Sequence, residues 1–315
     1  MHGSVSAGVF AAWLALGALV LPSHASDAAI SAPFEPGVIS TAAAEVRLAI
    51  SPDGRQMLWG SIGRDAPAEQ QDIWERHRVG DGWSTPARVS FDTEAVEFDP
   101  AFSKDGKKVY FHSDRAGGFG GTDIYVVTRD PTSFAFGTPA NAGPAINSKG
   151  DEWAPTPTRD GGLLFSSNGW GGRGKHDLFI ARPGAARPTN LGPSINTADE
   201  DFDAALSPEE ATLVFASGVM TDDKAATRLY VSRNEHGAWS PRQPLGLGCS
   251  DFVIGPSFDP ADDSILAYSA NCAGGRGRMD IHREHVPGPS HGSAAGPLAV
   301  HYPSPGARLA CRRRC

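Results

Sequence analysis

The chain has few cysteines, no long apolar segment and no excess of positive charge, and each of these absences excludes a class of protein. Four cysteines among 315 residues are too few for a small scaffold stapled by disulfides. The apolar run of residues 9–21 is too short to span a bilayer comfortably. With 28 basic and 36 acidic residues the formal charge is −8, which disfavours a nucleic acid as the partner.

Helical periodicity is also missing beyond the N-terminal segment. Instead, 37 glycines and 25 prolines indicate many tight turns and short strands. With 40% apolar residues, a chain of this length can form one large domain, but not that domain and a second sizeable one. We therefore expect a single β-rich domain.

Residues 98–127 form a unit that recurs in degraded form along almost the whole chain. Its first two strands are predicted at 98–103 and 108–113, because Gly106 between them supplies the positive φ of a tight turn. A glycine-rich loop at 114–121 then leads to a third strand at 123–127. Ser103 of this unit has counterparts at intervals of 49 to 55 residues, namely Ser51, Thr158, Ser207 and Asp259.

A fourth segment completes most copies of the repeat. It contains an aromatic residue and a proline, followed by a stretch such as residues 190–196, NLGPSIN. Four strands in roughly fifty residues, repeated several times, are typical of the blades of a β-propeller. A single blade cannot bury both faces of its sheet, so the blades must pack around a common axis. The sequence therefore predicts an all-β propeller with five blades of four antiparallel strands.

The fifth copy lacks a clear fourth strand, and the segment before the first copy offers one. Residues 33–41, PFEPGVIST, resemble the Gly-Pro-x-Ile-Asn-Thr element that ends other copies. We predict that this segment supplies the outer strand of blade five and so closes the ring. In the alternative, residues 298–302 fill that place and the N-terminal segment begins a sixth, partial blade.

The two ends of the sequence differ from the repeat in composition. The apolar run of residues 9–21 is followed by a proline and the small-residue site Ser23-His24-Ala25, although no basic residue precedes it. We interpret residues 1–25 as a cleaved export signal, which predicts a periplasmic or secreted protein without a transmembrane segment. The propeller is then expected at residues 26–286, and a disordered, low-complexity tail at 287–315.

Export to an oxidising compartment would allow disulfides to form. Cys249 precedes blade five and Cys272 lies in its glycine-rich loop, so a bridge between them would lock the last blade near the ring closure. Cys311 and Cys315 could pair within the tail, but free thiols are an equal alternative there, because a sequence does not fix connectivity.

Within residues 102–125, the successive motifs FSKDG, VYF, SDR, GG and DIY resemble the repeat of the TolB-like, WD-repeat-like β-propeller family of bacterial envelope proteins. The opening recurs as SPDG at residues 51–54, and the resemblance covers about residues 45–285. It implies a non-catalytic periplasmic platform that binds other proteins. The α/β domain of TolB and the peptidoglycan-binding domain of other members have no counterpart in this sequence, so a peptidoglycan role does not carry over directly.

Motifs for catalysis and for cofactors lack the context that they need. The string GPSHG at 288–292 matches G-x-S-x-G, but no predicted strand precedes it and no helix follows. The ten histidines show no metal-binding spacing such as H-E-x-x-H. The glycine-rich loops lack the helix that would help to cradle a phosphate. We expect no metal or other cofactor, with Ca²⁺ at the acidic run 199–203 as an open alternative.

An acidic residue stands six positions before four of the five anchors. These residues are Glu45, Glu97, Glu152 and Asp201. A repeated acid is expected to bind main-chain NH groups or an arginine of the next blade, because a catalytic site normally breaks a repeat. If the first strands are innermost, Asp99, Asp203 and Glu152 approach the mouth of the central channel, where five-bladed glycosidases place their acid and base.

Two functions follow from these patterns. The first is a monomeric, exported, non-enzymatic propeller that binds an envelope protein or a cell-wall component through the loops of one face. Aromatic and arginine side chains anchor interfaces, and the candidates are Arg115, Phe119, Trp170, Arg173 and Arg276. Packing between blades would explain Phe119 and Trp170 equally well. The second function is a carbohydrate-binding or glycoside-hydrolysing propeller that uses Asp99, Asp203 and Glu152.

Overall fold

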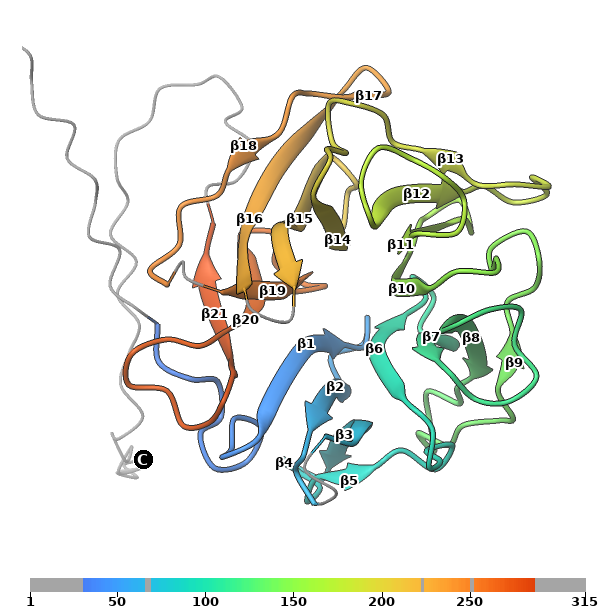
Figure 1. The fold of residues 1–315 in the computed structure, drawn as a ribbon. Helices are drawn as coiled ribbons and strands as arrows, with labels where there is room; N and C mark the ends of the chain where they lie inside the picture. Colours follow the sequence, from blue (N-terminus) through green and yellow to red (C-terminus); the bar gives the residue numbers. More distant parts are fainter. Residues whose placement is uncertain (1–30, 66–68, 222–223, 250–251, 287–315) are drawn as a thin grey trace, which may run out of the picture.

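The structure, a computed structural model, describes residues 31–65, 69–221, 224–249 and 252–286. In these residues the chain forms five antiparallel sheets and no helix, and the sheets stand around a common axis (Figure 1). The protein is therefore a five-bladed β-propeller, as the repeat predicts. None of the described segments is a helix long and apolar enough to cross a membrane.

Each blade runs from an inner strand outward. Blade one contains β1 (Ala44–Ile50), β2 (Gln56–Ile62), β3 (Gln71–Val79) and the short β4 (Gly82–Trp83) and β5 (Ala87–Arg88). Blade two contains β6 (Glu97–Phe102), β7 (Lys108–Ser113), β8 (Asp123–Thr128) and β9 (Ala140–Asn141). Blade three contains β10 (Glu152–Pro157), β11 (Leu163–Ser167), β12 (Asp177–Ala181) and β13 (Thr189–Asn190).

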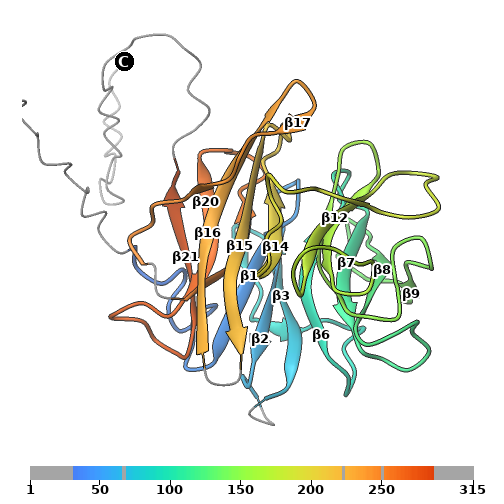
Figure 2. The same cartoon turned by 45° about the horizontal axis from the view of Figure 1, so that its top comes forward.

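Blades four and five depart from this pattern. Blade four contains β14 (Glu200–Leu206), β15 (Thr212–Thr221), β16 (Lys224–Glu235), β17 (Ala238–Trp239) and β18 (Gln243–Pro244). Here β15 and β16 form a long hairpin in place of the glycine-rich loop (Figure 2). Blade five has only three strands, β19 (Val253–Phe258), β20 (Ile265–Ala270) and β21 (Asp280–His285).

The segment before β1 takes the fourth place in blade five. The main-chain NH of Phe34 donates to the carbonyl of Ile281 at 2.7 Å, as the NH of Leu191 donates to Leu178 in blade three. Ile39 is fully buried and packs with Ile281. Pro33 and Pro36 have no NH to continue a ladder, so this segment is not a regular strand. The ring is closed by the N-terminal segment, as predicted, whereas residues 298–302 lie outside the described residues.

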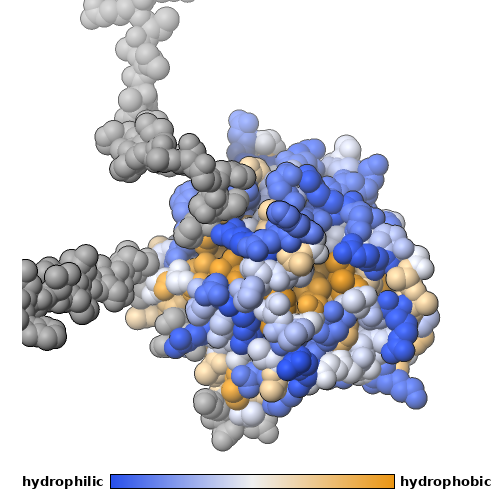
Figure 3. Space-filling view, turned by 90° about the horizontal axis from the view of Figure 1, so that it is seen from above, coloured by the Kyte–Doolittle hydropathy of each residue, from blue (hydrophilic) through white to orange (hydrophobic). Residues whose placement is uncertain are grey.

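The core consists of apolar layers between neighbouring blades. Leu58 and Ile73 of blade one pack with Phe111 and Val127 of blade two, and Leu164 of blade three packs with Phe215 of blade four in the same way. Figure 3 shows the ring from its side, where partly exposed apolar residues form patches among polar ones. Because each blade is covered on both sides by its neighbours, closing the ring completes the core.

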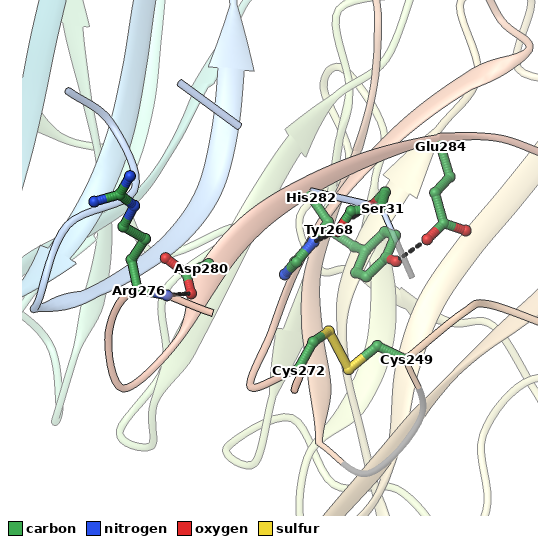
Figure 4. Close-up of a disulfide and its surroundings, with 8 residues drawn as sticks. All are labelled: Ser31, Cys249, Tyr268, Cys272, Arg276, Asp280, His282 and Glu284. Carbon is green, nitrogen blue, oxygen red and sulfur yellow. Dashed lines mark hydrogen bonds between the residues drawn. A yellow bond between two sulfur atoms is a disulfide. The ribbon is translucent and has the colours of Figure 1, made fainter. Parts of the chain in front are cut away.

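A disulfide joins Cys249 to Cys272, with their Cα atoms 5.7 Å apart (Figure 4). It links the connection before blade five to the loop after β20. Nearby, the ring of Tyr268 stacks on His282, whose Nδ1 lies 2.7 Å from the carbonyl oxygen of Ser31. The bridge therefore lies in the blade that the N-terminal segment completes. Cys311 and Cys315 are outside the described residues, as are the predicted export signal and tail.

Candidate functional site

The repeated acids at the start of the inner strands hold the preceding loops. Glu97 accepts the main-chain NH of Thr93 at 2.9 Å and its hydroxyl at 2.7 Å. Glu152 accepts the corresponding groups of Ser148 and the hydroxyl of Ser167. The same contact is made by Glu45 with Thr41 and by Asp201 with Thr197. These fully buried carboxylates are thus engaged within the fold, as expected for a repeated acid.

A second equivalent position, present in every inner strand, faces the axis, and its residue type differs from blade to blade. Every inner strand has a β-bulge at this point, and the bulged residue has a positive φ between 49° and 59°. The five residues are Arg47, Asp99, Ala154, Asp203 and Gly255. A bulge re-aims a side chain, and here it places two carboxyls and one guanidinium in the centre of the ring.

The side chain of Arg47 crosses the ring. Its Nη2 donates to the carbonyl of Pro155 at 3.1 Å, the hydroxyl of Thr156 at 2.7 Å and the carbonyl of Ala204 at 3.3 Å. These acceptors belong to blades three and four, whereas Arg47 lies in blade one. The guanidinium therefore obstructs the central channel.

Asp99 and Asp203 are both buried in this centre. Burial raises the pKa of Asp99 to about 6, although the charge of Arg47 opposes the shift. Burial and the nearby charge of Asp99 raise the pKa of Asp203 to about 7. Asp203 accepts the main-chain NH of Gly255 at 2.8 Å. The structure thus brings Asp99 and Asp203 together, whereas the carboxylate of Glu152 is directed to Ser148.

Two histidines that sequence reasoning did not single out complete the centre. The Nδ1 of His112 lies 3.4 Å from the Oδ2 of Asp99, and burial followed by the charge of Arg47 lowers the pKa of His112 to about 3. His176 stacks on Trp153, with ring centroids 3.8 Å apart, and its Nδ1 lies 2.8 Å from Glu200. One signal was available, because β7 has His112 where the corresponding strands have small residues, namely Gly60, Ser166, Ala216 and Ser269.

The acidic run 199–203, a possible Ca²⁺ site from the sequence, is divided among several partners. Glu200 binds His176, Asp201 binds Thr197 and Arg242, and Asp203 points into the centre. Within the described ranges, no three His, Cys, Asp or Glu side chains are grouped so that they could hold a metal ion.

A pocket of about 270 Å³ lies at one end of the channel. It is lined by the last residues of all five inner strands and by the turns that follow them. Among the lining residues, Arg47 lies deepest along its strand, whereas Lys104 and Arg159 belong to the turns. Neither Asp99 nor Asp203 is among the residues that line it.

The predicted interface residues lie on the opposite face, because the glycine-rich loops leave the other ends of the strands. Phe119 is 48% exposed there, and Arg173 and Arg276 are exposed. Arg115 instead stacks on Phe111 and Tyr125 and donates to Glu97 at 2.8 Å. Trp170 is half-buried and donates to the carbonyl of Ile146 at 2.7 Å. Packing thus accounts for Arg115 and Trp170, but not for the other three.

Acidic residues fix the shape of these loops. Asp123 accepts the main-chain NH of Phe119 at 2.6 Å, and Asp177 accepts that of Arg173 at 2.7 Å. Asp280 does the same for Arg276 at 2.6 Å (Figure 4). The three loops therefore present their exposed side chains from a common, hydrogen-bonded turn.

Comparison with known proteins finds likeness at the level of fold. No family model matches the chain, and no curated protein matches its sequence. Similar solved structures include TolB from Acinetobacter baumannii, with 17% identity, a TM-score of 0.48 and coverage of 77% of this chain and 55% of that one. This chain thus spans about half the length of that TolB.

Two further structures have similar scores. A putative TolB from Agrobacterium tumefaciens shares 17% identity with a TM-score of 0.47, covering 72% of this chain and 70% of that one. A gluconolactonase from Xanthomonas campestris shares 14% identity with a TM-score of 0.47, covering 80% and 78%. At such identities the likeness concerns the fold alone.

Proposed function

We propose that the chain is an exported, non-enzymatic propeller that binds a protein or another component of the bacterial envelope on its glycine-rich loop face. The observation that carries this proposal is the exposure of Phe119, a large apolar side chain, on a loop whose backbone Asp123 holds in place. Exposed aromatic and arginine side chains are typical interface anchors, and Arg173 and Arg276 are exposed on the equivalent loops of blades three and five. A loop already ordered before binding loses less entropy when it binds.

The use of the carboxylates supports a binding role over a hydrolytic one. The repeated acids are engaged by loop hydroxyls and main-chain NH groups. Asp99 and Asp203 are buried and do not line the pocket. A general acid or base must come within hydrogen-bonding reach of its substrate, and these positions favour a structural role for both residues.

The periplasmic location in this proposal comes from the sequence. Residues 9–25 have the apolar run and the small-residue site of an export signal, and the TolB-like resemblance of the repeat agrees with it. This part of the proposal predicts that the mature protein begins at Ser26. Determining the N-terminal residue of the protein purified from the periplasm tests it.

The interface is tested by a pull-down from an envelope extract. The amount of bound envelope component that each variant enriches is compared with the amount that the wild type enriches. The combined variant Phe119→Ala, Arg173→Ala and Arg276→Ala is expected to lose at least about tenfold of the specific enrichment. Val79→Ala is the matched control, because Val79 is 59% exposed at the end of β3, on the opposite face. Equal enrichment by the wild type, the triple variant and Val79→Ala would contradict the proposal.

One observation favours a second candidate, a glycoside-hydrolysing propeller. Asp99 and Asp203 break the repeat, lie close enough to influence each other and have raised pKa values of about 6 and about 7. Perturbed carboxyl pairs are common in active sites. If this function is correct, the protein hydrolyses a glycan or a peptidoglycan fragment, and Asp99→Asn and Asp203→Asn abolish turnover without unfolding the protein.

A further inference from the structure

The pocket at the other end of the channel is a candidate binding site that is independent of the proposed loop-face interface. Its volume of about 270 Å³ lies just below the usual range for small-molecule sites. All five blades contribute equivalent residues to it, so its walls belong to the core of the ring. Such a pocket is suited to a compact ligand and too small for an extended polymer.

The walls of the pocket are mainly apolar. Four large side chains come from the ends of the inner strands, namely Ile50, Phe102, Leu206 and Phe258. Prolines of the following turns, Pro52, Pro208 and Pro260, surround the outer end. Proline side chains lose almost no conformational entropy on burial, so this lining favours an apolar ligand body.

The charged residues of the lining are all cationic. They are Arg47, Lys104 and Arg159, and no described lining residue is an aspartate or a glutamate. Glu209 pairs with Arg159 at 2.8 Å, and Glu209 and Glu210 both lie near Lys104, but neither acid is part of the lining. A pocket with apolar walls and cations at both ends favours an anionic ligand over a neutral or cationic one.

Arg47 provides a second, independent observation. It is only 3% exposed, and its Nη2 has three acceptors in blades three and four. Its Nη1 is buried without a hydrogen-bond partner among the residues that the structure describes. A buried donor without an acceptor is costly, and an anion placed at this end of the pocket would accept from the guanidinium.

We propose that the pocket binds a small organic carboxylate whose apolar body lies between the prolines and whose carboxylate meets Arg47. The prolines and the strand ends select the apolar body, and the cations select the charge. The cations in the turns, Lys104 and Arg159, attract the ligand to the entrance.

Calorimetry on the full chain tests this selection with benzoate and 4-methylpentanoate as probes, at low ionic strength. At least one carboxylate is expected to bind, and its amide, benzamide or 4-methylpentanamide, is expected to bind at least about tenfold more weakly. Equal affinity for acid and amide would show an unselective apolar pocket and overturn the proposal. Failure of both carboxylates to bind would overturn it as well.

Variants locate the site. Arg47→Met is the obvious change, but it also removes hydrogen bonds across the ring and can prevent folding. Ala101→Phe instead fills the pocket from the end of β6 and is expected to abolish carboxylate binding while circular dichroism stays unchanged. Carboxylate binding that survives in this folded variant would place the ligand elsewhere and refute the proposal.

Removal of the cations in the turns is a further arm with a matched control. The double variant Lys104→Met and Arg159→Met is expected to weaken carboxylate binding several-fold. Lys107→Met, an exposed change in the same turn as Lys104 and outside the lining, is expected to leave it unchanged. An equal effect of both would indicate a diffuse charge effect and contradict the proposal. Phe119→Ala is expected to leave carboxylate binding intact, which separates this site from the loop face.

Discussion

The main-chain NH of Phe34 donates to the carbonyl of Ile281, 247 positions later in the chain, at 2.7 Å. In blades two and three the same hydrogen bond is made within one blade, by Ala142 with Ile124 and by Leu191 with Leu178. In blade five it joins the first described segment to the last strand. The ring is thus closed by a short segment that contributes side chains and few strand hydrogen bonds.

The first prediction concerns this closure. Ile39→Ala removes a fully buried side chain that packs with Ile281, so the free energy of unfolding is expected to fall by about 2–5 kcal/mol. Val38→Ala is the control, because Val38 is adjacent but 36% exposed, and its change is expected to stay within about 0.5 kcal/mol. Denaturant titration gives both values, and equal effects would show that this segment does not complete the core.

The second prediction concerns the disulfide of blade five. Cys249 and Cys272 are 23 positions apart, and a loop of this length predicts a loss of about 3 kcal/mol when the bridge is removed. Replacing both cysteines with alanine is therefore expected to lower the thermal midpoint. A reductant is expected to lower the midpoint of the wild type but not that of the double variant. If the reductant also lowered the thermal midpoint of the double variant, the stabilisation would come from thiols other than Cys249 and Cys272.

The third prediction concerns pH. Asp99 and Asp203 have pKa values of about 6 and about 7 in the folded chain, above about 3.9 in an unfolded one. The folded state binds these protons more tightly, so their contribution to stability decreases as the pH rises from about 4 to about 7. Asp203→Asn cannot lose a proton. Its free energy of unfolding relative to the wild type is therefore expected to increase between pH 5 and pH 8.

Two features make this measurement specific. The pKa of His112 is lowered to about 3, so its contribution to the free energy of unfolding increases with pH. His112 is present in both the wild type and Asp203→Asn, so to first order this contribution cancels in the difference between them. Asp130→Asn is the control, because hydrogen bonds from the main-chain NH groups of Thr132 and Ser133 lower the pKa of Asp130. Its relative stability is expected to decrease or stay flat over the same range. A flat profile for Asp203→Asn would contradict the assigned environment.

The fold could be predicted from the sequence because each blade repeats the same local chemistry. Gly106 has the predicted positive φ, of 69°, and Asn196 pairs with the backbone of Leu178 where the motif places it. The closing segment also follows the pattern of the fourth segment in the other blades. Glu35 occupies the position equivalent to Gly192, and both residues have a positive φ. Blade five lacks a regular fourth strand because Pro33 and Pro36 of the closing segment have no NH to donate to a ladder.

The centre of the ring could not be predicted in the same way, because it depends on contacts between distant blades. Arg47 bonds to Thr156, 109 positions away, and no local pattern indicates that contact. The sequence predicts Asp99 and Asp203 near the channel, but their burial and their absence from the pocket lining depend on the packing of the whole ring. Exposure is equally non-local, and it separates Phe119 from Trp170, which the sequence treats alike.

In the proposed function, the chain binds a partner on its glycine-rich loop face. The most direct test places a photo-crosslinking amino acid at position 119 or at position 79, one exposed position on each face, in cells that produce the full chain. If a partner binds there, position 119 gives a discrete adduct that is lost when Arg173 and Arg276 are replaced by alanine, and position 79 gives none. No adduct from position 119, or the same adducts from both positions, would contradict binding on the loop face.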